Sequence, residues 1–141
     1  MIVKKKLNVS ADAYFDILAR YLLKDLRHTV GKKVKASEIK AGYTFTKKYK
    51  LPDDTMFTSK QVIEEYDYGK AYRLSFAIPQ GTQIVGHKIK AIDDEHCMVE
   101  YEEKIISDIP AQKFRNVTGA LNKKKQMNKI LEMLEAELMV R

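Results

Sequence analysis

Cysteine and long apolar runs are scarce in this chain, and each scarcity excludes a class of protein. The single cysteine, Cys97, cannot form an internal disulfide or belong to a zinc site built from several cysteines. No stretch approaches the roughly 20 apolar residues that a membrane-spanning helix needs. The charged start is not followed by an apolar stretch of signal-peptide length. We therefore expect a soluble, cytoplasmic protein with a reduced thiol.

Motifs for metals, phosphates and cofactors are also lacking. The three histidines, His28, His87 and His96, show no short metal-ligand spacing, so we expect no metal site. Gly81 and Gly86 do not have the spacing, or the following helix, of a phosphate-binding loop. The sequence therefore predicts neither a metal nor a cofactor.

What the chain does contain is the composition of one folded domain with an unusual charge. Its 141 residues are 45% apolar and 32% charged, which predicts a single domain over residues 1–141. The 26 basic and 19 acidic residues give a net charge of +7. Counted along the sequence, residues 1–50 carry +9, residues 51–110 carry −6 and residues 111–141 carry +4. The basic excess therefore lies at the two ends of the chain.

The apolar pattern predicts a strand, a helix, about five strands and a long final helix. The first strand covers residues 2–9, and the first helix begins after Ser10 as its N-cap and ends near Gly31. Its expected buried face carries Tyr14, Leu18, Tyr21 and Leu22, with Phe15 and Leu26 beside them. Alternating strands joined by tight turns follow, although the inward face of residues 56–66 is undecided. The final helix is expected over about residues 111–140, and we expect it and the first helix to lie at opposite parts of the sheet's surround.

This order of elements resembles the helix-grip fold of the START and pollen-allergen-like superfamily (SRPBCC). Three stretches are similar to a small bacterial family of domains of unknown function, DUF3284: Leu7-Asn-Val-Ser-Ala-Asp-Ala-Tyr-Phe15, Asp93-Asp-Glu-His-Cys97 and Val99-Glu-Tyr-Glu-Glu-Lys104. The resemblance implies an α+β fold in which a curved antiparallel sheet of about six strands wraps around the long C-terminal helix. It also implies a cavity between the sheet and that helix. It carries over no catalytic residues, and the superfamily hosts many functions.

The expected cavity is lined by the apolar faces of the strands and of the final helix. Aromatic side chains dominate these faces, and aromatic groups suit an apolar ligand as well as a packed core. His87 and Glu103 are ionisable residues on otherwise apolar faces, and Lys47 is a third. The candidate ligand-binding residues are Tyr43, Phe45, Tyr49, Tyr72, Leu74, Phe76, His87, Ile89, Val99, Tyr101, Glu103, Phe114, Val117 and Leu121.

Three functions remain open from the sequence. The first is a non-enzymatic domain that binds a small apolar or amphipathic ligand in the cavity. The second is a small enzyme of the cyclase or hydrolase type, in which His87 and Glu103 act as an acid–base pair. The third is an interaction module whose basic clusters, such as Lys4–Lys6 and Lys123–Lys125, bind nucleic acid or an acidic protein. Nucleic acid is the less favoured partner, because these clusters lack aromatic residues that stack on bases. The sequence does not indicate an oligomeric state.

Overall fold

The structure is a computed structural model that describes residues 1–107 and 125–138. Its elements follow one another in the order that the apolar pattern predicts. They are β1 (Ile2–Leu7), α1 (Ala11–Thr29), the short 3-10 helix η1 (Ala36–Glu38), β2 (Thr44–Lys50), β3 (Met56–Asp67), β4 (Ala71–Ile78), β5 (Gly81–Asp93), β6 (His96–Ser107) and a helix over residues 125–138. Of the expected final helix, residues 111–124 and 139–140 lie outside the described residues.

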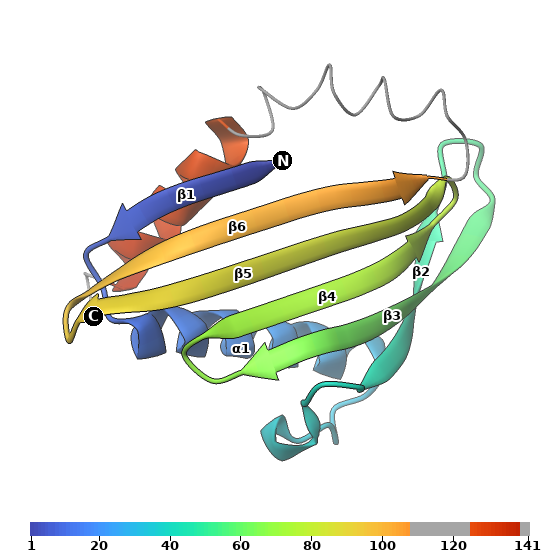
Figure 1. Cartoon of the computed structure of the whole chain (residues 1–141). Helices are drawn as coiled ribbons and strands as arrows, with labels where there is room; N and C mark the ends of the chain where they lie inside the picture. Colours follow the sequence, from blue (N-terminus) through green and yellow to red (C-terminus); the bar gives the residue numbers. More distant parts are fainter. Residues whose placement is uncertain (108–124, 139–141) are drawn as a thin grey trace.

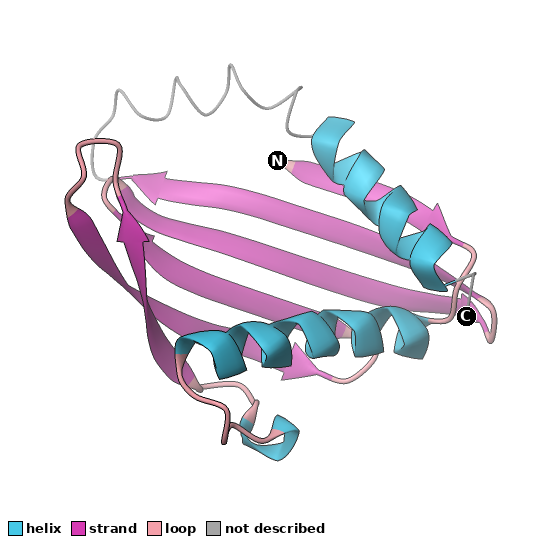
Figure 2. Cartoon of the chain, turned by 180° about the vertical axis from the view of Figure 1, so that it is seen from behind, coloured by secondary structure: helices cyan, strands magenta, loops and turns pink. Residues whose placement is uncertain are grey.

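The six strands form one antiparallel sheet in the order β1-β6-β5-β4-β3-β2. Consecutive strands from β2 to β6 are joined by tight turns, whereas β1 pairs with β6 at the far side. The sheet is curved, and both α1 and the helix of residues 125–138 lie against the same face (Figures 1 and 2). We call this face the inward face, and the opposite face the outer face.

Helix α1 begins and ends as its sequence predicts. The Ser10 hydroxyl accepts a hydrogen bond from the backbone N–H of Ala13, and Asp12 lies in the first turn, where its charge favours the helix dipole. The predicted buried face is wrong at Tyr21, whose side chain is 44% exposed. Ile17 is fully buried instead, so the stripe that packs on the sheet is rotated toward Phe15, Ile17 and Leu26.

The helix of residues 125–138 packs beside β1 and α1. Leu131 is fully buried in the core that this helix shares with the sheet. Its carboxylates reach both neighbours: Glu132 pairs with Lys5 at 3.2 Å, and Glu137 accepts a hydrogen bond of 2.8 Å from the Tyr21 hydroxyl. The first and last helices lie over different strands of the sheet (Figures 1 and 2), but this hydrogen bond brings them into contact, so the expectation that they lie at opposite parts of its surround is wrong. Their polar edges meet, which also explains why Tyr21 turns away from the sheet.

A β-bulge explains why the inward face of residues 56–66 could not be chosen from the sequence. The register of β3 against β4 shifts between Ile63 and Glu65. Before the shift, odd-numbered residues such as Gln61 and Ile63 are buried; after it, Tyr66 packs against Phe15 of α1. One extra residue reverses the alternation within a single strand.

Candidate functional site

The inward face has two parts that differ in how the described residues cover them. The first part, which we call the closed part, is packed under α1 and residues 125–138. Its side chains are almost completely buried and form one core cluster. The members from the sheet include Val3, Leu7, Ile89, Cys97, Val99 and Tyr101.

The second part, which we call the half-open part, lies toward the opposite ends of β4, β5 and β6. Its apolar side chains are only half-buried: Phe76 and Ile78 on β4, Val85 on β5 and Ile105 on β6. Phe76, Ile78 and Ile105 belong to neither of the two core clusters that the described residues form. Figure 2 shows α1 and the helix of residues 125–138 converging near the other end of these strands. The half-open part is therefore an apolar surface that the described helices do not seal.

His87 marks the boundary between the two parts. Its ring is 8% exposed and is surrounded by the rings of Tyr14, Tyr72 and Tyr101, at centroid distances of 6.0, 6.0 and 5.1 Å. The His87 Nδ1 and the Tyr14 hydroxyl share a hydrogen bond of 3.0 Å. Burial lowers the pKa of His87 to about 4, so the imidazole is neutral at pH 7.

The three tyrosines around His87 are neutral as well. Burial is the main cause that raises the pKa of Tyr14, of Tyr72 and of Tyr101 above the usual value for a phenol. For Tyr101, the charge of Glu103 adds to the rise in pKa. This cluster therefore offers hydroxyl groups and rings but no charge.

A polar group with one carboxylate lies beside the half-open part, on β5 and β6. The Glu103 carboxylate accepts hydrogen bonds from the Tyr101 hydroxyl at 3.0 Å and from the Gln83 side-chain amide at 2.8 Å. Glu103 lies directly opposite Val85, and Gln83 lies opposite Ile105. Because opposite residues in an antiparallel pair share a face, the carboxylate and the amide adjoin the half-buried apolar side chains.

A second polar group lies on the other side of Phe76. Gln61 and Ser59 on β3 are buried, and the Gln61 amide donates to the Tyr49 hydroxyl at 3.1 Å and to the Ser59 hydroxyl at 3.3 Å. Phe76 lies opposite both Gln61 and Gln83. Gln61, Phe76 and Gln83 therefore form one row across β3, β4 and β5, in which an aromatic ring lies between two side-chain amides.

The structure places every described candidate residue on the inward face, but divides them between its parts. The closed part contains Ile89, Val99 and Tyr101. A second core cluster below α1 includes Phe45, and Tyr43 and Leu74 pack against it. Phe76 and Glu103 lie at the half-open part, with Tyr49 at the edge. The candidates Phe114, Val117 and Leu121 lie outside the described residues.

The catalytic alternative depends on whether His87 and Glu103 act together. Their hydrogen bonds run to different partners: His87 to Tyr14, and Glu103 to Tyr101 and Gln83. Lys47, the third ionisable candidate, pairs with Asp25 of α1 at 2.7 Å. Acid–base catalysis by His87 and Glu103 stays a hypothesis.

The reasoning from sequence missed Ser59, Gln61 and Gln83. Gln83 shares its parity with Val85 and His87 and could have been found by that signal. Gln61 and Ser59 could not, because the bulge in β3 hides their face. Cys97 is fully buried, and burial followed by the charge of Glu135 raises the pKa of its thiol to about 11, so it is a poor nucleophile.

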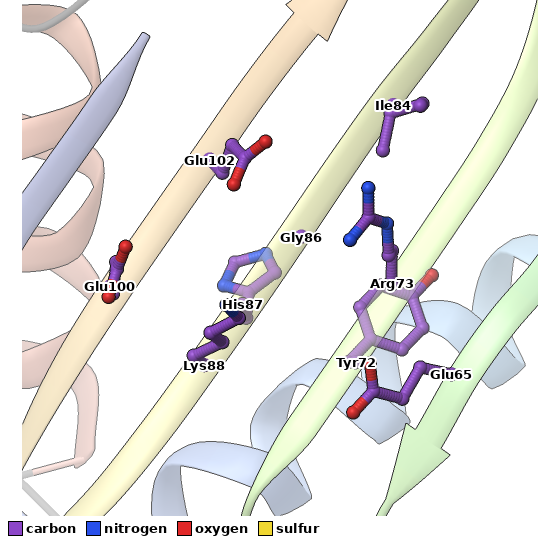
Figure 3. Close-up of a pocket in the computed structure, with 9 residues that line it drawn as sticks. All are labelled: Glu65, Tyr72, Arg73, Ile84, Gly86, His87, Lys88, Glu100 and Glu102. Carbon is purple, nitrogen blue, oxygen red and sulfur yellow. The ribbon is translucent and has the colours of Figure 1, made fainter.

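The outer face carries a separate shallow hollow over Gly86 (Figure 3). Gly86 lies directly between Arg73 and Glu102 on the neighbouring strands, so the hollow is the space that its missing side chain leaves. Charged side chains of both signs surround it. Its position excludes it from the cavity that the sequence predicts, which would lie on the inward face. Among residues 1–107 and 125–138, we find no cluster of potential metal ligands and no helix that could span a membrane.

The curved antiparallel sheet with both helices on its inward face defines a helix-grip fold, as in Bet v 1-like proteins. Within that class, the chain belongs to the family described as Domain of unknown function (DUF3284), whose model matches residues 1–132. No curated protein matches the chain significantly.

Solved structures with the same fold are distant in sequence. Norcoclaurine synthase from Thalictrum flavum is 10% identical with a TM-score of 0.62, over 100% of this chain and 86% of that one. Ara h 8.0201 is 12% identical with a TM-score of 0.54, over 100% and 97%. The Mll3558 protein from Rhizobium loti is 12% identical with a TM-score of 0.57, over 97% and 94%. At this identity the similarity establishes the fold, and function must be argued from the site.

Proposed function

We propose that this protein binds a small amphipathic molecule on the half-open part of the inward face. The observation that carries the proposal is the row of Gln61, Phe76 and Gln83, in which an apolar ring lies between two amide side chains. Ligand sites in proteins are mostly apolar surfaces with a few well-placed polar groups, and this row has that composition.

The half-buried apolar side chains supply the driving force for binding. Phe76, Ile78 and Ile105 each keep part of their surface exposed although they lie on the inward face. Covering apolar surface yields roughly 25 cal/mol for each Å² removed from water, so a ligand that covers these side chains gains affinity from their contact area.

The polar side chains favour a ligand that is not an anion. The Glu103 carboxylate is half-buried and already accepts from Gln83 and Tyr101, so a second carboxylate beside it would be repelled. Hydroxyl or amide groups on the ligand can instead exchange hydrogen bonds with the half-buried Gln83. We therefore expect an apolar body with a polar group that is not an anion.

Titrations with three amphiphiles that share one alkyl chain test this proposal. Their polar ends are a glycerol ester, a carboxylate and a primary amine, and native mass spectrometry with calorimetry reports binding. The glycerol ester is expected to bind at least about tenfold more tightly than the carboxylate, which is about 1.4 kcal/mol. Equal affinity for the ester and the carboxylate, or no binding of any of the three, would contradict the proposal.

A matched pair of variants on β4 locates the site. Phe76→Ala removes the central ring of the row and should weaken binding of the glycerol ester several-fold. Ser75→Ala, the neighbouring residue on the outer face, where its hydroxyl donates to Glu64, should leave that affinity unchanged. Equal effects of the two changes would place the ligand elsewhere.

A further inference from the structure

Strand β2 lies at one edge of the sheet, and its edge away from β3 is unpaired among the described residues. The strand order places β3 on one side of β2 and no other described strand on the other (Figure 1). An edge strand of this kind presents backbone N–H and C=O groups that can pair with another chain. The side chains around the edge determine which kind of chain can pair with it.

The register decides which backbone groups of β2 point outward. Tyr43, just before β2, is level with Ile63, whose backbone N–H donates to the Tyr43 carbonyl at 2.9 Å. Since hydrogen-bonded and non-hydrogen-bonded pairs alternate in an antiparallel ladder, odd-numbered residues of β2 bond to β3. Thr44, Thr46, Lys48 and Lys50 therefore direct their backbone groups away from the sheet.

A groove runs beside this edge. It is lined by Thr44, Phe45 and Thr46 of β2, by Thr29 and Val30 at the end of α1, and by Lys60 of β3. Val30 is 51% exposed, so the α1 side of the groove has an apolar contact to offer. An added strand would direct alternate side chains toward Val30 on one side and toward the outer face of the sheet on the other.

The outer face beside the groove is basic. Lys60 lies opposite Thr46, Lys48 lies opposite Thr58, and both lysines are exposed. Neither makes an ion pair within the described part of the chain, whereas Lys50 pairs with Asp54 at 3.2 Å. Residues 24–50 hold nine basic and two acidic residues, which gives +7 and equals the net charge of the whole chain.

The same lysines disfavour a second copy of this protein as the occupant. Pairing of two β2 strands would bring the outer-face lysines Lys48 and Lys60 of the two copies toward one another, and like charges on paired strands repel. A strand with carboxylates would meet the lysines with opposite charge.

We propose that the edge of β2 is a docking site for an extended peptide segment of a partner protein, in which acidic and apolar residues alternate. The segment adds a seventh strand to the sheet. Its acidic side chains lie over Lys48 and Lys60, and its apolar side chains contact Val30. This interaction is independent of the ligand on the inward face.

Binding of three synthetic peptides to the full chain, measured by fluorescence anisotropy, tests the docking site. The first alternates glutamate with valine, the second has lysine in place of glutamate, and the third is the first with alternate backbone amides N-methylated. Only the first is expected to bind, and methylation should weaken binding by at least about tenfold because it removes the strand-pairing donors. Equal binding of the first and third peptides would overturn the proposal, since charge alone would then explain the interaction.

Two variants locate the site on β2. Thr46→Pro removes an outward N–H that β3 does not use, as proline on edge strands permits, and should abolish binding of the glutamate peptide. The double variant Lys48→Glu with Lys60→Glu keeps the backbone and should reverse the preference toward the lysine peptide. Unchanged selectivity of the double variant would overturn the proposal even if Thr46→Pro fails to fold. A single-stranded oligonucleotide that competes fully with the glutamate peptide and binds Thr46→Pro as well as the native chain would also overturn it, in favour of a nucleic-acid surface.

Discussion

His87 gives the sharpest prediction about stability, because a neutral imidazole is buried among three tyrosines. In the folded state burial lowers its pKa from 6.5 to about 4, while in the unfolded chain the ring keeps its usual pKa. Between these two values the unfolded chain binds more protons than the folded one. The stability that His87 contributes is therefore complete above pH 6.5 and is lost as the pH falls from about 6.5 toward 4.

The magnitude follows from the size of the shift. A change of one pKa unit corresponds to about 1.4 kcal/mol, so the full shift of His87 is worth about 3 kcal/mol. Much of this loss of stability falls in a pH range in which most carboxylates stay charged. Between pH 7 and pH 5, protonation of His87 in the unfolded chain lowers the free energy of unfolding by about 2 kcal/mol.

The assay compares the native chain with His87→Gln, which does not titrate and whose amide can still bond to the Tyr14 hydroxyl. Urea unfolding followed by circular dichroism gives the free energy of unfolding at pH 7 and at pH 5. The native chain should lose about 2 kcal/mol more than the variant over this interval. All other ionisable groups are the same in the two proteins, so their contributions cancel in the difference. An equal loss in both proteins would refute the burial of a neutral His87.

Three further predictions concern the packing of the helices and the thiol. Leu131→Ala should lower the free energy of unfolding by about 3 kcal/mol, because it leaves a cavity in the core. The control Met133→Ala, at a side chain that is 70% exposed, should change this free energy by less than about 0.5 kcal/mol. Similar losses for the two variants in urea unfolding would contradict the packing of this helix. Ser10→Ala should cost about 1 kcal/mol in the same assay through loss of the N-cap, and no loss would contradict it. Cys97 should react with iodoacetamide at pH 8 only as fast as the chain unfolds, because its thiol is buried and its pKa is raised to about 11; rapid alkylation of the folded protein would contradict this.

Local signals in the sequence predicted the elements of the fold well. Ser10 and the tight turns after β2, β3, β4 and β5 fix where elements begin and end, and these signals act over a few residues. The positions of the helices on the sheet depend instead on contacts between distant residues. The hydrogen bond between Tyr21 and Glu137 joins residues that are 116 positions apart, and no local sequence pattern predicts it.

The inward face of the strands was predicted where alternation is regular and missed where it is broken. On β4, β5 and β6 the parity of the apolar residues correctly placed Phe76, His87 and Glu103 on the inward face. On β3 the bulge between Ile63 and Glu65 reverses the parity, so the buried amide of Gln61 could not be assigned. Whether a polar side chain on an inward face is paired or available depends on its neighbours in space, as the pairing of Lys47 with Asp25 shows.

The most direct test of the central proposal is a titration of the ¹⁵N-labelled chain with the glycerol ester, followed by nuclear magnetic resonance. The side-chain amide signals of Gln61 and Gln83 report on the two ends of the row that flanks Phe76. If the ligand lies on the half-open part, both signals shift and saturate at the same concentration, while the side-chain amide of Asn8, beside the end of β1, does not. Shifts confined to the outer face, or no shift of either glutamine at saturation, would contradict the proposed ligand site.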